Sequence, residues 1–292
     1  MKKLVRYGRP VSLLFTKRGK VAYKPYLCIS CSLTPGVKRW IRTFKSSGVS
    51  SQVRLLVFMW KPYFEAELKE FLSEGDYVIY KQDSDFTGNV AALMPFLKLL
   101  KSKDYSEDWF IWVDCHDVVF QRTMYPFWDD QGFSVVLSSE YARHEELSEY
   151  WGSIIKACPS RDFEFLLNRT IYNGGCFAMK APYFCDYLVS LNEYYRCYGD
   201  FKGFSYNGVQ LFFNKWVQKH IFSCIVLSDF LNLCSGYLKA GFKDPAEVSG
   251  VSEVKDGKFV DPVGQLFTIV HANGETKKIL DQLYKEEGHG MP

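Results

Sequence analysis

Two aspartates, Asp114 and Asp117, stand directly after the apolar run of residues 108–113, in the segment Asp-Cys-His-Asp. In an open parallel sheet, ligands bind at the carboxyl ends of the strands, so both carboxylates are expected at a binding edge. Hard oxygen ligands suit Mg²⁺ or Mn²⁺, and such an ion would neutralise a nucleotide diphosphate. An aspartate turn that merely closes a strand is the simpler alternative.

A histidine, a glycine and a lysine follow the last expected strand, at His271, Gly274 and Lys277. His271 offers an imidazole nitrogen as a ligand for Mn²⁺. Gly274 would let the backbone approach a phosphate closely, and Lys277 would pair with the phosphate oxygens. A lone histidine is usually structural, but this spacing after a strand favours a binding site.

Two glycines, Gly174 and Gly175, precede the apolar residues 177–180 and follow Asn173. The pattern predicts a tight turn whose backbone lies near a ligand. Asn173 supplies a donor and an acceptor for a sugar hydroxyl. A plain hairpin turn before a strand is the alternative.

Apolar patterning places these motifs in an alternation of strands and helices. The first half, with its strand–helix–strand–helix order, predicts an α/β fold with a mostly parallel, Rossmann-like sheet. A basic hairpin is expected at residues 10–24, a helical turn at 163–169, and a loop or small ribbon at 239–264. The expected strands are 26–32, 52–60, 76–80, 108–113, 133–138, 177–180, 221–227 and 267–271, and the expected helices are 37–46, 63–73, 89–101, 183–195, 209–219 and 277–286.

The three motifs, in this order, resemble those of GT-A glycosyltransferases, above all the glycosyltransferase domain of procollagen lysyl hydroxylases and their relatives. That group has Asp-x-x-Asp after an apolar strand, an Asn-x-Gly-Gly-Phe-like turn, and a closing His-x-Asn-Gly with a following Lys. The resemblance spans roughly residues 26–285 and implies a GT-A fold, a mixed and mostly parallel sheet flanked by helices. The matching residues are Asp114, Asp117, Asn173 to Phe177, His271, Asn273, Gly274 and Lys277.

The resemblance also implies roles for particular residues. Asp114, Asp117 and His271 would hold Mn²⁺ or Mg²⁺, and the donor would be a UDP-sugar that supplies a hexose such as glucose. Ser30, Ser32 and Thr34 would lie near the uridine. The other donor contacts that we expect are Asn173, Gly174, Gly175, Gln210, Gly274 and Lys277.

One part of the family pattern is missing. The group carries Asp-Asp-Gln before a helix of its second half, where residues 206–212 of this chain read Tyr-Asn-Gly-Val-Gln-Leu-Phe. Gln210 is kept, but Asn207 cannot be a nucleophile or a base. The catalytic group is therefore open among Glu140, Asp200 and Asp229, and the resemblance favours a retaining mechanism over an inverting one. A catalytically inactive GT-A fold that binds a nucleotide-sugar or nucleic acid is the alternative from a different class.

Charge is distributed unevenly along the chain. The first 64 residues hold 14 Lys and Arg and no acid, whereas the remainder holds 22 basic and 33 acidic residues. This asymmetry indicates a polyanion near the N-terminal part, with Lys38, Arg39 and Arg42 of the helix at 37–46 as its contacts. Phosphate contacts give affinity without sequence choice, so hydroxymethylated pyrimidine bases in DNA, flipped out of the stack, would suit as acceptor. A protein acceptor, a cell-surface glycan, an anionic membrane surface, a nucleotide diphosphate and a solvated basic face are the alternatives.

The composition, with 47% apolar and 24% charged residues among 292, is ordinary for a folded soluble protein. No run approaches the roughly 18 apolar residues of a membrane-spanning helix. We expect a single domain over residues 1–292, with a basic hairpin at 1–24, a nucleotide-sugar-binding half at 25–130 and an acceptor-side half at 131–292.

Nine cysteines without a tight framework indicate a reducing compartment. The basic start lacks an apolar run of signal-peptide length, so we expect a cytoplasmic protein, in a cell or in a phage-infected cell. Cys28 and Cys31 form a CxxC inside an expected strand. Positions i and i+3 of a strand face opposite sides, so we expect no metal or redox pair there.

Overall fold

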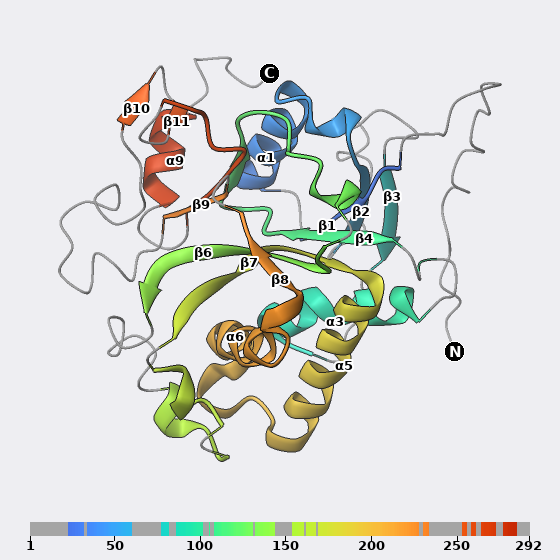
Figure 1. The fold of residues 1–292 in the computed structure, drawn as a ribbon, viewed down its shortest axis with the longest axis vertical. Coiled ribbons are helices and arrows are strands. Elements are labelled where there is room, and N and C mark those ends of the chain that lie inside the picture. Colours follow the sequence, from blue (N-terminus) through green and yellow to red (C-terminus); the bar gives the residue numbers. More distant parts are fainter. Residues whose placement is uncertain are drawn as a thin grey trace.

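The computed structural model describes fifteen stretches of the chain, and the fold is given for these (Figure 1). The expected helix at 63–73 lies outside them, as does the hairpin at 10–24 except for its last two residues, so both stay predictions. The described residues are 23–31, 34–59, 77–81, 86–101, 105, 108–130, 132–143, 154–160, 162–167, 169–227, 230–233, 253–255, 258–260, 264–272 and 277–284.

A seven-stranded mixed sheet forms the centre of the molecule, with the strand order β3-β2-β1-β4-β7-β6-β8. The strands β1, β2, β3 and β4 run parallel, β7 is antiparallel to both β4 and β6, and β8 is parallel to β6. The mixed, mostly parallel sheet that the sequence predicts is thereby confirmed. The bounds are β1 Tyr26–Cys31, β2 Arg54–Met59, β3 Tyr77–Lys81, β4 Trp109–Val113, β6 Val135–Arg143, β7 Thr170–Lys180 and β8 Cys224–Val226.

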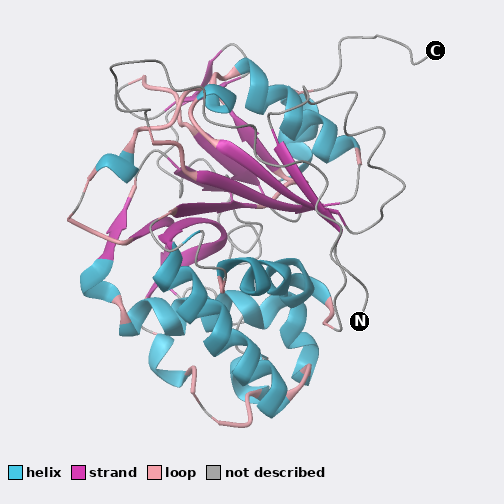
Figure 2. Cartoon of the chain, turned by 90° about the vertical axis from the view of Figure 1, so that its right-hand side faces the viewer, coloured by secondary structure: helices cyan, strands magenta, loops and turns pink. Residues whose placement is uncertain are grey.

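Helices cover both faces of this sheet, which explains why its inner strands are apolar on both sides. Figure 2 shows most helices gathered on one face, and these are α3 Gly88–Leu100, α5 Ala181–Tyr198 and α6 Val209–Lys219. The opposite face carries α1 Pro35–Ser46, whose Trp40, Ile41 and Phe44 are buried against the sheet. Cys28 packs in the hydrophobic core under α3, α5 and α6, whereas Cys31 packs in the core under α1. The two cysteines of the CxxC pair therefore face opposite sides of the sheet.

A second, three-stranded sheet brings the C-terminal part of the chain to the end of β4. Its order is β5-β12-β9, with β5 Val118–Phe120, β12 Ile269–Ala272 and β9 Phe230–Leu233. Strand β12 is antiparallel to β5 in a register that sets His271 opposite Val118. Sequence patterning predicted β12, which ends the apolar run that begins at residue 267, but it predicted neither β5 nor β9.

The C-terminal elements complete this side of the fold. A two-stranded ribbon, β10 Glu253–Lys255 and β11 Lys258–Val260, lies in the segment expected as a loop or small ribbon. The helix α9 Lys277–Leu283 follows and buries Leu280 against Val119 and Val270. Within the described ranges the chain also forms 3₁₀ segments at Val49–Ser51, Phe127–Asp129, Glu164–Leu166, Phe201–Gly203 and Ile221–Ser223, and a π-helix at Phe204–Gly208.

The glycine pair does not form the turn predicted for it. Gly174 and Gly175 lie inside the long strand β7, so that prediction was wrong. The side-chain oxygen of Asn173 accepts a hydrogen bond from the backbone nitrogen of Gly175 at 2.8 Å. Pairing with β6 shifts register at the same level, so the glycines mark an irregular strand approached closely by its neighbours.

Within the described ranges, no helix combines the length and apolar character that crossing a membrane requires.

Candidate metal centre

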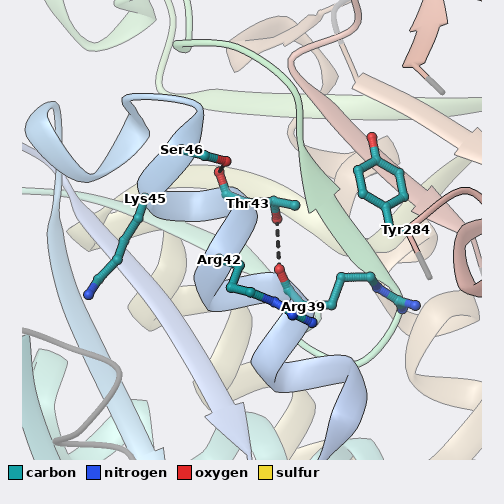
Figure 3. Close-up of a pocket in the computed structure, with 6 residues that line it drawn as sticks. All are labelled: Arg39, Arg42, Thr43, Lys45, Ser46 and Tyr284. Carbon is teal, nitrogen blue, oxygen red and sulfur yellow. Dashed lines mark hydrogen bonds between the residues drawn. The ribbon is translucent and has the colours of Figure 1, made fainter. Parts of the chain in front are cut away.

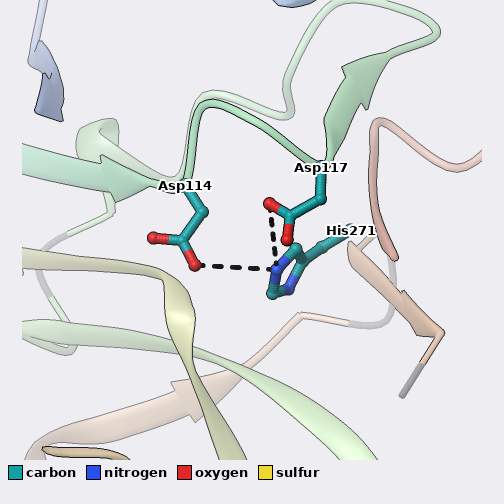
Figure 4. Close-up of side chains that lie close together, drawn as sticks. All are labelled: Asp114, Asp117 and His271. Carbon is teal, nitrogen blue, oxygen red and sulfur yellow. Dashed lines mark ion pairs between the residues drawn. The ribbon is translucent and has the colours of Figure 1, made fainter. Parts of the chain in front are cut away.

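Three side chains expected to share a metal ion come together at the carboxyl end of β4. Nε2 of His271 lies 3.6 Å from Oδ2 of Asp114 and 3.6 Å from Oδ1 of Asp117 (Figure 4). One ligand atom from each residue falls within 4.8 Å of the other two. His271 is 3% exposed, while both carboxylates are partly open to solvent. The site is thus anchored on one side and accessible on the other.

Backbone pairing fixes these three residues although 154 positions separate Asp117 from His271. The Asp114 nitrogen donates to the carbonyl oxygen of Gly175 at 2.8 Å, which extends the β4–β7 ladder by one residue. The Ala272 nitrogen donates to the carbonyl oxygen of Asp117 at 2.9 Å, which ties β12 to the turn between β4 and β5. The geometry of the cluster therefore follows from the two sheets.

Gly175 provides the space that the cluster needs. A methyl group on its Cα would lie 2.8 Å from Cε1 of His271 and closer still to Oδ2 of Asp114. The same group on Gly174 would meet Cα of Gln210 at 3.6 Å, an ordinary contact. We call the space beside Gly175, which any Cβ there would fill, the cradle. The two carboxylates and the imidazole around it are a suitable donor set for Mn²⁺ or Mg²⁺.

The electrostatics of the two carboxylates differ. Burial and the neighbouring charge of Asp117 raise the pKa of Asp114 from 3.8 to about 7, against an opposing effect of His271. Burial would also raise the pKa of Asp117, but His271, Lys277 and His116 outweigh it and leave that pKa below its usual value. In the metal-free protein one carboxylate is therefore readily charged and the other holds a proton near neutrality. A divalent cation would stabilise both in the charged form.

The turn that carries the aspartates is held by residues from the end of β1 and the start of α1. Oγ1 of Thr34 lies 3.0 Å from Nδ1 of His116, and Sγ of Cys115 donates to the carbonyl oxygen of Ser30. Gly36 packs so closely on the His116 carbonyl that a side chain there would overlap it. Neither His116 nor Gly36 was predicted as a residue of the site. The signal available was the His between the two aspartates and the Pro-Gly that opens the next helix.

The residues expected on the donor side are distributed around this cluster. Lys277 opens α9 and is half-buried, and its charge acts on both Asp117 and His116. Gln210 lies on α6 against Gly174. Thr34 caps α1 by accepting from the Val37 nitrogen, and Ser30 is buried at the end of β1. Ser32 and Gly274 lie outside the described residues.

Asn173 is not at the surface of the site, where a residue that binds a sugar hydroxyl would lie. Its side chain is fully buried, and its oxygen is used by the Gly175 nitrogen. It therefore shapes the strand that forms the cradle. Nearby, Asn214 of α6 bonds the Tyr172 nitrogen at 2.7 Å and the Tyr172 carbonyl at 2.9 Å, fixing α6 to β7.

The structure describes the three candidates for the catalytic group to different extents. Asp200 is exposed, and its Oδ1 accepts a hydrogen bond at 2.6 Å from the nitrogen of Ser205, which lies in the π-helix ahead of α6. Glu140 is placed only by its backbone, in β6 beside β7. Asp229 lies outside the described residues.

The basic residues of α1 divide into an inner and an outer group. Arg39 is buried, whereas Lys38 is half-buried and Arg42 is exposed. Arg42 lines an open pocket of about 560 Å³ between α1 and α9 (Figure 3). The residues lining it are Arg39, Arg42, Thr43, Lys45, Ser46 and Tyr284.

No protein-family model and no curated protein matches the sequence. Solved structures do match its fold. The apo form of mouse xyloside xylosyltransferase 1 superposes with a TM-score of 0.52 at 14% identity, over 87% of this chain and 98% of that one. The galactosyltransferase LgtC, in complex with donor and acceptor sugar analogues, gives 0.53 at 13% identity, over 91% and 97%. An active-site mutant of LgtC with glutamate in place of glutamine gives 0.53 at 13% identity, over 88% and 94%.

The bifunctional glycosyltransferase WbbM, in its apo form, superposes with a TM-score of 0.53 at 9% identity. The match covers 92% of this chain but 51% of WbbM. Together these structures show that the chain has a GT-A fold, as the sequence predicted. At identities of 9–14% the likeness establishes the fold, so the activity has to be argued from the site. The narrower resemblance to procollagen lysyl hydroxylases stays a prediction.

Proposed function

We propose that the protein is a metal-dependent glycosyltransferase that transfers a hexose from a UDP-sugar. The observation that carries this is the convergence of Asp114, Asp117 and His271 at the carboxyl end of a central strand in a GT-A fold. Ligands of open α/β sheets bind at that edge. The structural neighbours are named as glycosyltransferases, which supports the same reaction class.

Each residue of the centre has a definite task in this proposal. Asp114, Asp117 and His271 would hold Mn²⁺ or Mg²⁺, which when bound supplies Lewis-acid stabilisation of the leaving diphosphate. Lys277 would pair with a diphosphate oxygen, since its charge already acts on the same turn. Gly175 keeps the approach to the ion free of side-chain atoms.

We further propose that transfer retains the anomeric configuration. The support for this is the resemblance of the motifs to those of the procollagen lysyl hydroxylase group. Gln210, which lies against Gly174, is the residue kept from that group's Asp-Asp-Gln pattern, and LgtC also has an active-site glutamine. Glutamine cannot act as a base, so its expected task is to hold the reacting sugar by hydrogen bonds. The anomeric proton coupling of the product, measured by NMR, decides between retention and inversion.

For the acceptor, we propose hydroxymethylated pyrimidine bases in DNA, met in the cytoplasm. The support is the acid-free first 64 residues and the exposed cations of α1 at the open pocket. LgtC was solved with an acceptor sugar analogue, so a glycan acceptor is the competing outcome. If DNA binds, charge reversal at Lys38 and Arg42 should flatten the salt dependence of affinity and leave UDP-sugar binding intact. Absence of DNA binding at low salt would discard this acceptor.

The experiment that tests the activity is a donor and acceptor screen read by mass spectrometry. It includes several UDP-hexoses, hydroxymethylated DNA and glycan acceptors, each with Mn²⁺ and with chelator. We expect a mass increase of one hexose that needs metal and is absent for Asp114→Ala. A product formed equally well in chelator would contradict the metal-dependent mechanism.

The second candidate is a binding module without turnover. The observation that favours it is the segment at 206–212, which lacks both acids of the family pattern. Calorimetry separates the two functions: a module binds UDP-sugar in the presence of Mn²⁺ but gives neither hydrolysis nor transfer over the whole screen.

A further inference from the structure

Arg39 connects two parts of the candidate metal centre that are far apart in sequence. Its side chain is 7% exposed. One guanidinium nitrogen donates to the carbonyl oxygen of His116 at 2.9 Å, and another forms an ion pair with Asp281 of α9. The sequence pattern assigned Arg39 to a polyanion surface, but these contacts direct its guanidinium to the interior.

The first contact acts on the turn between the two aspartates. His116 lies in the middle of that turn, so fixing its carbonyl fixes the backbone that presents Asp114 and Asp117. Thr34 holds the ring of the same histidine, and Gly36 packs on the same carbonyl. Arg39 is therefore one of three α1-side contacts that converge on His116.

The second contact acts on the other part of the centre. Asp281 lies four residues after Lys277, on the same face of α9, and Lys277 acts electrostatically on Asp117. The α9 helix follows β12, which carries His271. The packing of Leu280 and a hydrogen bond from Tyr284 to Gln121 also hold α9, so loss of the ion pair should not release the helix.

We propose that Arg39 is a positioning residue of the metal centre, which holds the aspartate turn and the α9 end of the site in one arrangement. A guanidinium suits this task because its rigid planar fork donates in two directions at once, whereas a lysine ammonium offers a single mobile point charge. This inference rests on the proposed metal-dependent function. It goes further by assigning a role to a residue that touches neither the ion nor the substrate.

The test is Mn²⁺ binding to the purified protein, measured by calorimetry without any donor or acceptor. Removing the groups that orient metal ligands commonly weakens metal affinity about 10–100-fold. We expect Arg39→Ala to weaken Mn²⁺ binding about tenfold with unchanged stoichiometry, and Arg39→Lys to recover part of the loss. The matched control is Arg196→Ala, an exposed arginine of α5 on the opposite face of the sheet.

The separation of affinity from stoichiometry distinguishes positioning from simple stability. A variant that is partly unfolded binds less Mn²⁺ per chain with an unchanged dissociation constant, whereas a displaced ligand turn binds one ion more weakly. If Arg39→Ala does not fold, Asp281→Ala decides, because Asp281 is 53% exposed and its removal deletes the contact to α9 while Arg39 keeps its hydrogen bond to the His116 carbonyl. We expect Asp281→Ala to weaken Mn²⁺ binding severalfold, and Asp129→Ala to leave it unchanged.

The possible failures are distinguishable. Wild-type affinity in folded Arg39→Ala or, in its place, Asp281→Ala would overturn the role of Arg39 while leaving the metal centre standing. Wild-type protein that binds no Mn²⁺ would overturn the metal centre itself, and the positioning role with it.

Discussion

The two walls of the metal centre are built on opposite principles. One wall is the turn between β4 and β5 with His271, where charged groups converge and α1 braces the backbone. The other is β7 with α6, which presents glycines and side-chain amides. In the first wall the residues contribute ligand atoms. In the second wall, Gly175 matters because it has no side chain and so leaves room for Asp114 and His271.

This difference determines what a substitution does on each side. In the charged wall, removing a carboxylate deletes a ligand and changes the charge. In the glycine wall, adding one methyl group fills the space an ion would need, although the added group is neutral. Loss of a ligand should therefore lower turnover more than filling of the space beside Gly175 does.

The largest effect is expected in the charged wall. Asp114→Ala or Asp117→Ala should lower turnover at least about 10³-fold, equivalent to about 4 kcal/mol of transition-state stabilisation, because the ion loses a carboxylate ligand. Initial rates of UDP-sugar consumption measure this. Asp129→Ala, at an exposed aspartate that ends the 3₁₀ segment Phe127–Asp129, is the matched control. Near-normal turnover in either active-site variant would remove the carboxylates from the mechanism.

A neutral substitution in the glycine wall should come next. Gly175→Ala should weaken Mn²⁺ binding and turnover about 10–100-fold, because its methyl group would overlap Asp114 and crowd His271. Gly174→Ala is a control of the same chemistry one residue away, where the new contact is ordinary. Neither glycine has a positive φ, so both substitutions are free of backbone strain. Equal Mn²⁺ affinities in the two variants, by calorimetry, would contradict the cradle.

A third prediction tests how far the charged wall extends. Lys277→Ala should weaken UDP binding by about 1–3 kcal/mol, the usual cost of removing a charged hydrogen-bond partner. Lys278→Ala is the control, an exposed lysine at the next position of the same helix. Calorimetric titration with UDP in saturating Mn²⁺ measures both. If the two variants bind UDP alike, Lys277 belongs to the solvent-facing side of α9.

The charged wall was also the more predictable of the two. Asp114 and Asp117 stand after an apolar strand, and His271 lies at the end of another, so position alone indicated a shared edge. Apolar patterning predicted the mostly parallel sheet and most of its strands and helices, and the resemblance of the motifs predicted the GT-A fold. The order of the strands in the sheet was not predicted. What joins the two aspartates to His271 is the short β5–β12 ladder, and three residues of strand carry too little pattern to reveal it.

The glycine wall could not be predicted correctly from composition. Gly174 and Gly175 satisfy the rule for a turn, yet they lie in a strand, where neighbouring atoms come too close for a Cβ at Gly175. Asn173 has the chemistry of a sugar ligand, but its partner is a backbone nitrogen two residues away. Arg39 fits a basic surface by sequence and is buried by tertiary contacts. Each of these outcomes depends on approaches between segments distant in the chain.

The last prediction uses pH to separate the charged wall with and without its ion. Burial and Asp117 raise the pKa of Asp114 to about 7, so below that pH the metal-free protein holds a proton where the ion must bind. Mn²⁺ affinity should therefore fall as the pH falls, by about fivefold between pH 7 and pH 6 from this group alone. The stability of the metal-free protein should change in the opposite direction. Because the folded state binds this proton more tightly than the unfolded chain, stability from Asp114 increases as the pH falls from 7 toward 4.

Thermal melts at pH 8 and pH 6 without Mn²⁺ measure the stability of the metal-free protein. The increase in melting temperature that Mn²⁺ causes at each pH reports how its affinity changes with pH. Asp114→Asn should remove its share of the pH dependence in the metal-free protein, whereas Asp129→Asn should leave the dependence as in the wild type. The comparison of these two variants isolates Asp114 from the histidines and from the other carboxylates. A metal-free wild type whose melting temperature follows that of Asp114→Asn at both pH values would show that Asp114 is ionised throughout. The proton would then not compete with the ion, and the charged wall would stand ready for metal at either pH.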